Sequence, residues 1–126
     1  MSTITVTNIK ATGETASRAV SGVAGMWIDI PSGQASINNS INVSSLTDTG
    51  TGDGAVNFTS SFANTTYCVL TGSEDNGSSS PIREHDITDG QKTASKYDFE
   101  TFFVNSSSDR TNQDCRTYSA IHGDLA

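Results

Sequence analysis

The chain of 126 residues has the length of one compact domain, and its 7 Lys and Arg against 14 Asp and Glu give a net charge of −7. This acidity, without any basic cluster, excludes the electrostatic footprint of a nucleic-acid-binding protein and would repel an anionic membrane surface. No apolar run approaches the length of a membrane-spanning helix, so we expect neither a nucleic-acid partner nor membrane insertion.

The composition favours a folded, β-rich domain over a disordered chain. Only 33% of the residues are hydrophobic, and Ser, Thr, Asn and Gly make up 56 of the 126 residues. Disordered chains share this polarity, but they usually have more charged residues than the 17% and fewer aromatic residues than the 7% found here. Because so few apolar residues build a thin core, we expect a homo-oligomer that buries further surface between its copies.

The N-terminal 25 residues predict one strand and a connector. Residues 3–9 alternate between apolar and polar positions, which is the pattern of a β-strand. Residues 11–25 are rich in small residues, and Gly22 and Gly25 argue against a long helix, so this stretch is an extended arm or a short helical turn. The N-terminus lacks the pattern of a secretory signal, and we therefore expect synthesis in a cytoplasm.

A strand and a turn are expected next. Residues 26–30, Met-Trp-Ile-Asp-Ile, predict a strand that places Trp27 and Asp29 on one face and the three apolar residues on the other. Residues 31–33, Pro-Ser-Gly, predict a turn, because Pro and Gly both favour turn conformations.

A β-hairpin is predicted over residues 43–58. The parity of the apolar residues changes between Val43 and Leu46, which indicates a bulge or a strand end. Residues 47–54, TDTGTGDG, hold three glycines and two aspartates, residues that accept the backbone angles of tight turns. Residues 55–58, AVNF, alternate again, so the stretch reads as strand, turn and strand.

Further strands separated by polar loops are expected in the second half of the chain. The strands cover residues 65–72, 82–87, 97–104 and 115–123, and the loops cover residues 73–81, a turn at Asp89–Gly90, and residues 105–114. The strand over 97–104 has the strongest pattern, and its odd-numbered residues, from Tyr97 to Phe103, should share one face.

Seven or eight short strands with regularly spaced turns predict an all-β fold. We expect a single compact antiparallel sandwich or jelly-roll-like domain. Residues 1–25 would form an N-terminal strand and arm for attachment or oligomerisation, and residues 26–126 would form the β-sandwich domain.

No residue pattern points to catalysis or to a cofactor. Asp48 and Asp53 carry carboxylates of the kind that bind Ca²⁺, but their spacing does not match an EF-hand loop, so we interpret them as turn residues. His85 lies in Arg-Glu-His-Asp, where adjacent residues of a strand alternate between faces, which favours a solvated strand or loop over a catalytic site. We therefore expect no enzyme activity, no catalytic residue, no cofactor and no metal.

Cys68 and Cys115 are the only two cysteines of the chain. Two cysteines do not make a disulfide framework, and their spacing fits no zinc pattern. We favour two separate thiols, one of them in the core. A disulfide that forms after release from the cell, and metal binding, stay open as alternatives.

The middle of the chain carries an ordered series of motifs. Residues 17–30 read SRAVSGVAGMWIDI, residues 42–53 read NVSSLTDTGTGD, and AVNF and then NTTYCVL, at residues 64–70, follow. Together these stretches resemble a domain of phage tail-fibre and related virion surface proteins, especially those of marine and cyanobacterial viruses. The resemblance covers residues 17–71, and residues 115–123, CRTYSAIHG, match it loosely.

The resemblance implies a virion structural protein, assembled in the host cytoplasm as a homotrimer. The leading interpretation is a tail-fibre or receptor-binding-type domain, held to the particle by the residues before Gly25, with loops at 72–81, 88–95 and 105–114 facing a host-surface glycan. The alternative is a capsid decoration or head-fibre protein that binds neighbouring capsid proteins. A third hypothesis, a capsule depolymerase, would need paired carboxylates in a groove. The candidate receptor-contact residues are Asp75, Asn76, Arg83, His85, Asp109 and Arg110.

Overall fold

A computed structural model of the chain describes residues 6, 8–9, 18–19, 23–74, 82–87 and 91–126, with the backbone alone at residues 8–9, 18–19 and 82–85. All regular elements in these residues are β-strands. At the N-terminus, β1 (Asn8–Ile9) pairs antiparallel with β2 (Arg18–Ala19), so part of the connector is a short strand and not a helical turn. The rest of the strand expected over residues 3–9 lies almost entirely outside the described residues.

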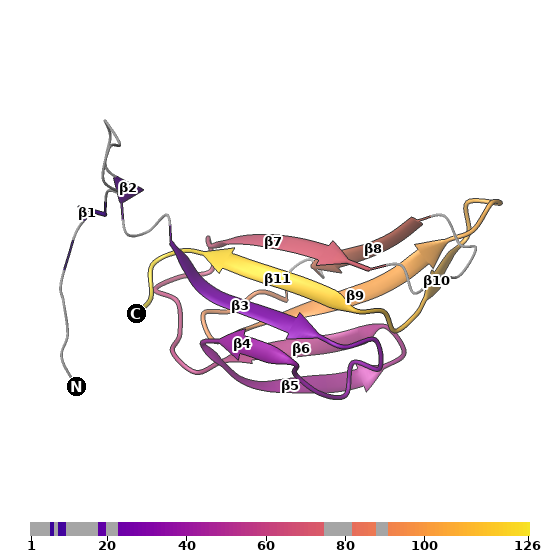
Figure 1. The fold of residues 1–126 in the computed structure, drawn as a ribbon, viewed down its shortest axis with the longest axis horizontal. Helices are drawn as coiled ribbons and strands as arrows, with labels where there is room; N and C mark the ends of the chain where they lie inside the picture. Colours follow the sequence, from indigo (N-terminus) through magenta and orange to yellow (C-terminus); the bar gives the residue numbers. More distant parts are fainter. Residues whose placement is uncertain (1–5, 7, 10–17, 20–22, 75–81, 88–90) are drawn as a thin grey trace.

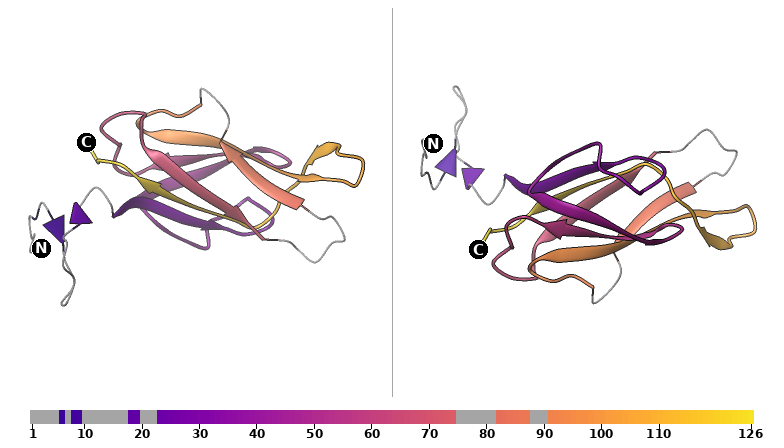
Figure 2. Two further views of the ribbon diagram at one scale, coloured as in Figure 1. Left: turned by 90° about the horizontal axis from the view of Figure 1, so that it is seen from above. Right: turned by 90° about the horizontal axis from the view of Figure 1, so that it is seen from below.

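Two larger antiparallel sheets form the domain, with four strands in the order β4–β3–β11–β7 and five strands built around β9. The strands of the first sheet are β3 (Ala24–Ile30), β4 (Asn39–Ile41), β7 (Cys68–Ser73) and β11 (Thr117–His122). Those of the second are β5 (Val43–Gly50), β6 (Asp53–Phe58), β8 (Ile82–Ile87), β9 (Lys96–Val104) and β10 (Arg110–Asn112). The predicted all-β, antiparallel fold is confirmed, and Figures 1 and 2 show the two sheets as layers of a sandwich-like arrangement.

The core lies between the layers because inward and outward side chains alternate along the strands. On β3, Met26, Ile28 and Ile30 are buried, as predicted, while Trp27 and Asp29 lie on the opposite face. Other core members come from both sheets and from the segment after β6, and include Val56, Phe58, Phe62, Tyr67, Tyr97, Phe99 and Ile121. Since a fully buried side chain of this kind contributes about 1.5–3 kcal/mol relative to exposure, this alternation decides which face of each strand turns inward.

Local turns follow the sequence closely. The turn predicted at residues 31–33 is closed by a hydrogen bond from Gln34 N to the Pro31 carbonyl at 2.9 Å. The break predicted between Val43 and Leu46 is confirmed, because the register of β5 shifts between Val43 and Ser45.

Strand β9 organises the five-stranded sheet. Its residues 99–104 pair with β8 along one edge. Its residues 96–100 pair with β6, and its residues 102–104 pair with β10. Both β8 and β6 pair with Glu100, and both β8 and β10 pair with Phe102. Because a strand has only two edges, β6 and β10 lie end to end along the edge of β9 that faces away from β8.

Gly52, at the tip of the β5–β6 hairpin, lies at the joint between β6 and β10. The hairpin predicted over residues 43–58 is confirmed, and Gly52 has a φ of +74°, in the left-handed region. Its carbonyl accepts a hydrogen bond from Thr101 N at 2.6 Å, and its N–H donates to Asp114 Oδ1 at 2.6 Å. A Cβ at this position would lie 2.3 Å from the Thr101 carbonyl oxygen, so only glycine fits.

One prediction at the end of β9 holds and another is wrong. The pairing of β9 with β8 and β10 continues to Val104 without a register shift, so Phe103 shares the face of Tyr97, Phe99 and Thr101, as predicted. Burial no longer follows this alternation, since Phe102 is buried and Phe103 is only partly buried. The guanidinium of Arg110 lies 3.8 Å from the centre of the Phe102 ring and covers it on the outer side. Residues 105–114, expected as a loop, contain β10, because their backbone completes the pairing of β9 beyond the end of β6.

Candidate functional site

The outer face of the five-stranded sheet carries a polar groove of about 360 Å³. The groove lies over β5, β6 and β9, and its lining includes Thr47, Thr49, Asp53, Asn57, Asp98 and Glu100. The lining side chains that belong to β6 and β9 point outward, because they alternate with buried residues of the same strands. The volume lies in the range of small-ligand sites, which makes the groove the candidate functional site.

Strand register arranges the lining of the groove in rows. Asn57 of β6 lies opposite Lys96 of β9, and Ala55 lies opposite Asp98. On its other side Ala55 lies opposite Thr47 of β5. Because Ala55 has a very small side chain, the sheet surface is hollow between Thr47 and Asp98, and this gap gives the groove its depth.

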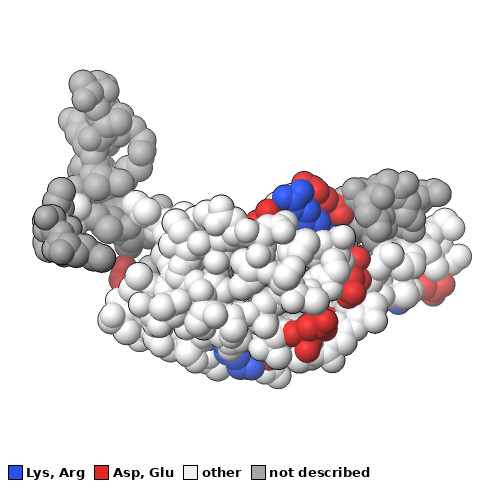
Figure 3. All heavy atoms as spheres, turned by 60° about the horizontal axis from the view of Figure 1, so that its bottom comes forward, with Lys and Arg blue, Asp and Glu red and all other residues white. Residues whose placement is uncertain are grey.

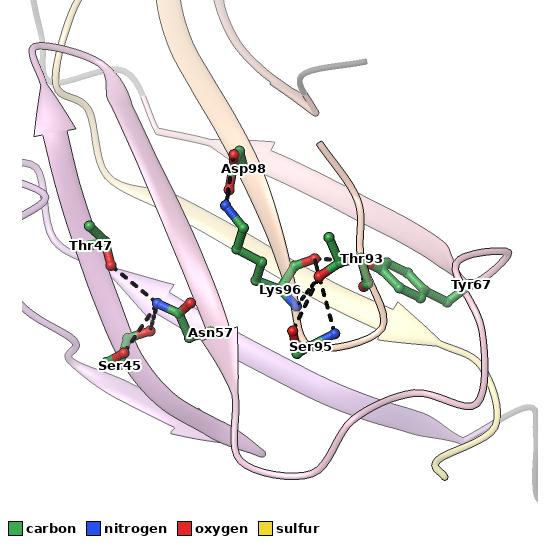
Figure 4. A network of polar contacts seen from close by, with 8 residues as sticks. All are labelled: Ser45, Thr47, Asn57, Tyr67, Thr93, Ser95, Lys96 and Asp98. Atoms are coloured by element: carbon green, nitrogen blue, oxygen red, sulfur yellow. Dashed lines mark hydrogen bonds and ion pairs between the residues drawn. The ribbon is translucent and has the colours of Figure 1, made fainter. Parts of the chain in front are cut away.

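Hydrogen bonds hold the lining side chains in place (Figure 4). Lys96 Nζ lies 2.8 Å from Asp98 Oδ1 and 3.1 Å from Oδ2. The amide of Asn57 donates to Ser45 Oγ at 3.1 Å and to Thr47 Oγ1 at 3.2 Å. The groove therefore presents carboxylate, hydroxyl, amide and ammonium groups in positions that are already ordered, so a bound ligand would meet both donors and acceptors.

An acidic row closes one end of the groove. Asp53 and Asp86 both lie opposite Glu100, one on each side of it. Asn112 Nδ2 donates to Asp53 Oδ2 at 3.2 Å, and the guanidinium of Arg110 donates to Glu100 Oε2. These donors offset part of the repulsion within the row. Among the residues that the structure describes, no group of three or more His, Cys, Asp or Glu side chains could hold a metal ion.

Tyr67 anchors the segment that leads into β9, next to the groove. Its hydroxyl donates to the carbonyls of Thr93 and Lys96, each at 3.0 Å (Figure 4). Burial, with a smaller contribution from the charge of Asp98, raises the pKa of Tyr67 to about 12. The phenol therefore stays protonated around neutral pH and acts as a structural donor.

The predicted receptor-contact residues that the structure describes lie toward one end of the five-stranded sheet, because β8 and β10 flank the same stretch of β9. Asp75 and Asn76 lie outside the described residues. Arg83 and His85 belong to β8, where their backbone pairs with Phe103 and Thr101, and their side chains are not described.

Asp109 and Arg110 follow the turn between β9 and β10. Asp109 is exposed, and its N–H donates to Asn105 Oδ1 at 2.9 Å. Arg110 is the predicted contact residue that the structure brings to the end of the groove, through its pairing with Glu100. Sequence reasoning missed Asn57 and Asp98, because alternation marks such residues as exposed but does not show which strands bring them together.

The three loops expected to face the host do not all lie at one end of the domain. Residues 91–95 precede β9 and contact Phe62, whose N–H donates to the Ala94 carbonyl at 2.8 Å. Residues 105–109 follow β9 and lie at its opposite end (Figure 1). This part of the expectation is corrected, because a strand of 9 residues separates the two segments by about 30 Å.

The remaining candidates have structural roles. Asp48 Oδ1 accepts a hydrogen bond from Gly50 N at 3.1 Å, as expected of a turn residue. Cys115 is buried and Cys68 is exposed, and both are thiols that are not joined by a disulfide. This agrees with the favoured interpretation of two separate thiols, one of them in the core.

Comparison of the chain with family models, with curated proteins and with solved structures finds no match. Within the described residues, the structure has no helix of the length and apolarity needed to cross a membrane.

Proposed function

We propose that this protein is a structural protein of a phage virion, with a tail-fibre or receptor-binding-type β domain that attaches the particle to its host. One observation supports this most directly. The segment of residues 42–58, which carries the centre of the family resemblance, includes β5 and β6. These two strands supply Thr47, Thr49, Asp53 and Asn57 to the polar groove. The stretch that resembles virion proteins thus builds a large part of the candidate binding site.

The chemistry of the groove suits a glycan of the host surface. Sugar hydroxyls donate and accept hydrogen bonds, and the groove offers partners of both kinds. A single contact of this type is weak. A homotrimer, present in several copies on one particle, would raise the overall avidity through multivalency. No residue of the chain is assigned a catalytic role in this proposal.

The two ends of the domain support a defined orientation on the particle. Strand β3 begins at Ala24 close to the C-terminus, where Phe62 pairs with Leu125 (Figure 1). The turn at residues 105–109 lies at the other end. In the proposed arrangement the residues before Gly25 hold the domain to the virion, and the turn at 105–109 points away from it.

The second candidate is a capsid decoration or head-fibre protein. The outer face of the four-stranded sheet favours it, because Ile41 and Leu70 expose more than half of their surface there. An apolar face of this kind suits contact with another protein better than contact with a sugar. A decoration protein would use such a face against the capsid.

Immunogold electron microscopy of intact virions, with an antibody against this chain, separates the candidates. Label at the tail or its fibres is the result expected for an attachment protein. Label spread over the head would replace that function with decoration. Absence of label from every particle would reject a virion protein altogether.

Binding of the purified protein to host cells tests the groove itself. Asn57→Ala and Asp98→Ala should each weaken binding, while Ser36→Ala, in an exposed turn away from the groove, should not. Equal binding by all three variants would reject the groove as the receptor site. Binding to empty capsids in place of cells would again support decoration.

A further inference from the structure

An apolar row crosses all four strands of the four-stranded sheet on its outer face. Strand register places Ile41 of β4 opposite Trp27 of β3, Trp27 opposite Ala120 of β11, and Ala120 opposite Leu70 of β7. Ile41 is 54% exposed and Leu70 is 56% exposed, one at each end of the row. Trp27 and Ala120, which are partly buried, join these two exposed side chains across the sheet. A contiguous apolar patch of this kind indicates a surface that another molecule covers.

The row borders a shallow apolar groove of about 560 Å³. Trp27, Leu70, Tyr118 and Ala120 line it, and Gly72 lies opposite Tyr118 in the next row of the sheet. Because Gly72 has no side chain, the β7 side of this next row stays open. Ile41 and Leu70 thus protrude at the two edges of the outer face, and the aromatic side chains between them lie lower. Side chains of another sheet could fill this hollow.

The charges beside this row are paired with one another. Arg116 Nε and Nη2 donate to the two carboxylate oxygens of Asp29 at 3.1 and 2.9 Å, and Arg116 Nη1 lies 3.5 Å from Glu74 Oε2. The Tyr118 hydroxyl donates to the same Glu74. These contacts leave the face with little net charge although the whole chain carries −7.

The distribution of charge on the surface agrees with this picture. On the side drawn in Figure 3, acidic and basic side chains gather in a few groups and leave a broad uncharged area between them. Two copies of a strongly acidic chain repel each other over most of their surface. They can approach most closely where charges are absent or already paired, and the apolar row is such a place.

We propose that a second copy of this chain covers the apolar row, through face-to-face packing of the two four-stranded sheets. The four strands contain 7, 3, 6 and 6 residues. At about 16 Å² of sheet per residue, these strands give roughly 350 Å² of flat area per copy, and protruding side chains add to it. The two faces together give roughly 700 Å² of flat area, which is less than the total of about 1,000 Å² that stable specific interfaces exceed and suits a weak contact.

This area sets the strength of the contact. It lies below the range of stable specific interfaces, so the association is weak and reversible and depends on protein concentration. Salt strengthens it, because salt screens the repulsion between two acidic chains and leaves apolar burial in place. The inference goes beyond the homotrimer of the proposed function, because packing of one face against its own copy joins chains in pairs, and a trimer would be held together by other surfaces. It rests on the attachment function, since a decoration protein would use the same face against the capsid.

Sedimentation of the purified full chain over a range of concentrations tests the inference. The wild type should self-associate reversibly, and Leu70→Lys and Ile41→Lys should each weaken this association about tenfold or more, because a charge in an apolar contact centre must be desolvated. Thr111→Lys places the same charge at an exposed position of the other sheet and is the matched control. A monomeric wild type would overturn the inference, as would face variants that associate like the control.

Trp27 supplies a second readout that needs no variant, since it is the only tryptophan of the chain. Its fluorescence emission should shift to longer wavelength on dilution, as the partner leaves and the indole meets water. Association without any change in this emission would place the interface elsewhere and overturn the inference. Because both experiments use the protein alone, they can fail while virion labelling succeeds, and the reverse.

Discussion

Tyr97 and Ser119 lie in different sheets and join them through a hydrogen bond between their hydroxyl groups. Both side chains are buried, with exposed fractions of 0% and 4%. Burial, opposed by the hydrogen bond with Ser119, raises the pKa of the Tyr97 phenol well above its usual value. The two hydroxyls satisfy each other in the middle of an apolar core, so the removal of one leaves the other without this partner.

Tyr97→Phe should therefore lower the free energy of unfolding by about 1–2 kcal/mol, and Ser119→Ala should have a similar effect. The double variant should lose less than the sum of the two single losses, because the second substitution removes a group that already lacks its partner. Urea denaturation of the four proteins measures these differences. Strictly additive losses would show that the hydrogen bond contributes nothing between the sheets.

Alkaline pH should destabilise the domain through its buried phenols. The pKa of Tyr67 is about 12 in the folded protein, against 10.0 for an unperturbed tyrosine. The protonated phenol of Tyr67 contributes its full stabilisation of the folded state below pH 10. This stabilisation is lost as the pH rises toward 12, because only the unfolded chain releases the phenol proton readily between these pH values. Denaturation at several pH values should show this loss, and Tyr67→Phe should make it smaller. An unchanged pH dependence in the variant would contradict the assignment.

Gly52→Ala should be strongly destabilising, by about 2 kcal/mol or more, since alanine disfavours the positive φ and its Cβ would overlap the Thr101 carbonyl oxygen. Gly33→Ala is the matched control, because a Cβ there meets nothing within 4 Å. Its effect should stay within about 0.5 kcal/mol. Thermal unfolding compares the two variants, and similar losses would reject the steric argument.

Acid should weaken the contact between Asp29 and Arg116. The hydrogen bonds from Arg116 keep the pKa of Asp29 below its usual value of 3.8, although desolvation opposes them. A lowered pKa gives stability that is present above pH 3.8 and is lost as the pH falls through the pKa of the folded state.

Asp29→Asn tests this contribution. The variant should be less stable than the wild type at neutral pH by about 1 kcal/mol, the value expected of a partly exposed pair with good geometry. The difference should vanish in strong acid, where the carboxyl group is protonated in both states of the wild type. Urea denaturation at neutral and acidic pH provides the comparison, and a difference that persists in acid would point to a cause other than charge.

Much of the strand content was predictable because alternation is a local property. The alternation of residues 26–30 shows the inner and outer faces of β3 directly in the sequence. A strand was also predicted correctly at residues 82–87, although these residues do not alternate. The hairpin over residues 43–58 followed from its glycines. In each case neighbouring residues carry all the information that the prediction uses.

Other features depend on residues that are distant in the sequence. Gln34 is polar and lies in a turn, yet it is buried, because its amide donates to Thr101 Oγ1 and to the Cys115 carbonyl, 67 and 81 positions away. Strand β10 has no apolar alternation of its own and forms because β9 offers it an open edge. The polar groove needs β5, β6 and β9 in register, so no single segment could reveal it.

Next to Gly52 the neighbouring strands of β9 change, so the two parts of this strand are held by different contacts. Up to Thr101 the strand is held by β6 and by the core, and beyond it the strand continues with β8 and β10 toward the turn at residues 105–109. That turn is closed from within, since Asn105 Oδ1 accepts from the N–H groups of Ser107 and Asp109. Its sequence is thus largely independent of the core, which makes it a natural insertion point for a foreign peptide displayed on this scaffold.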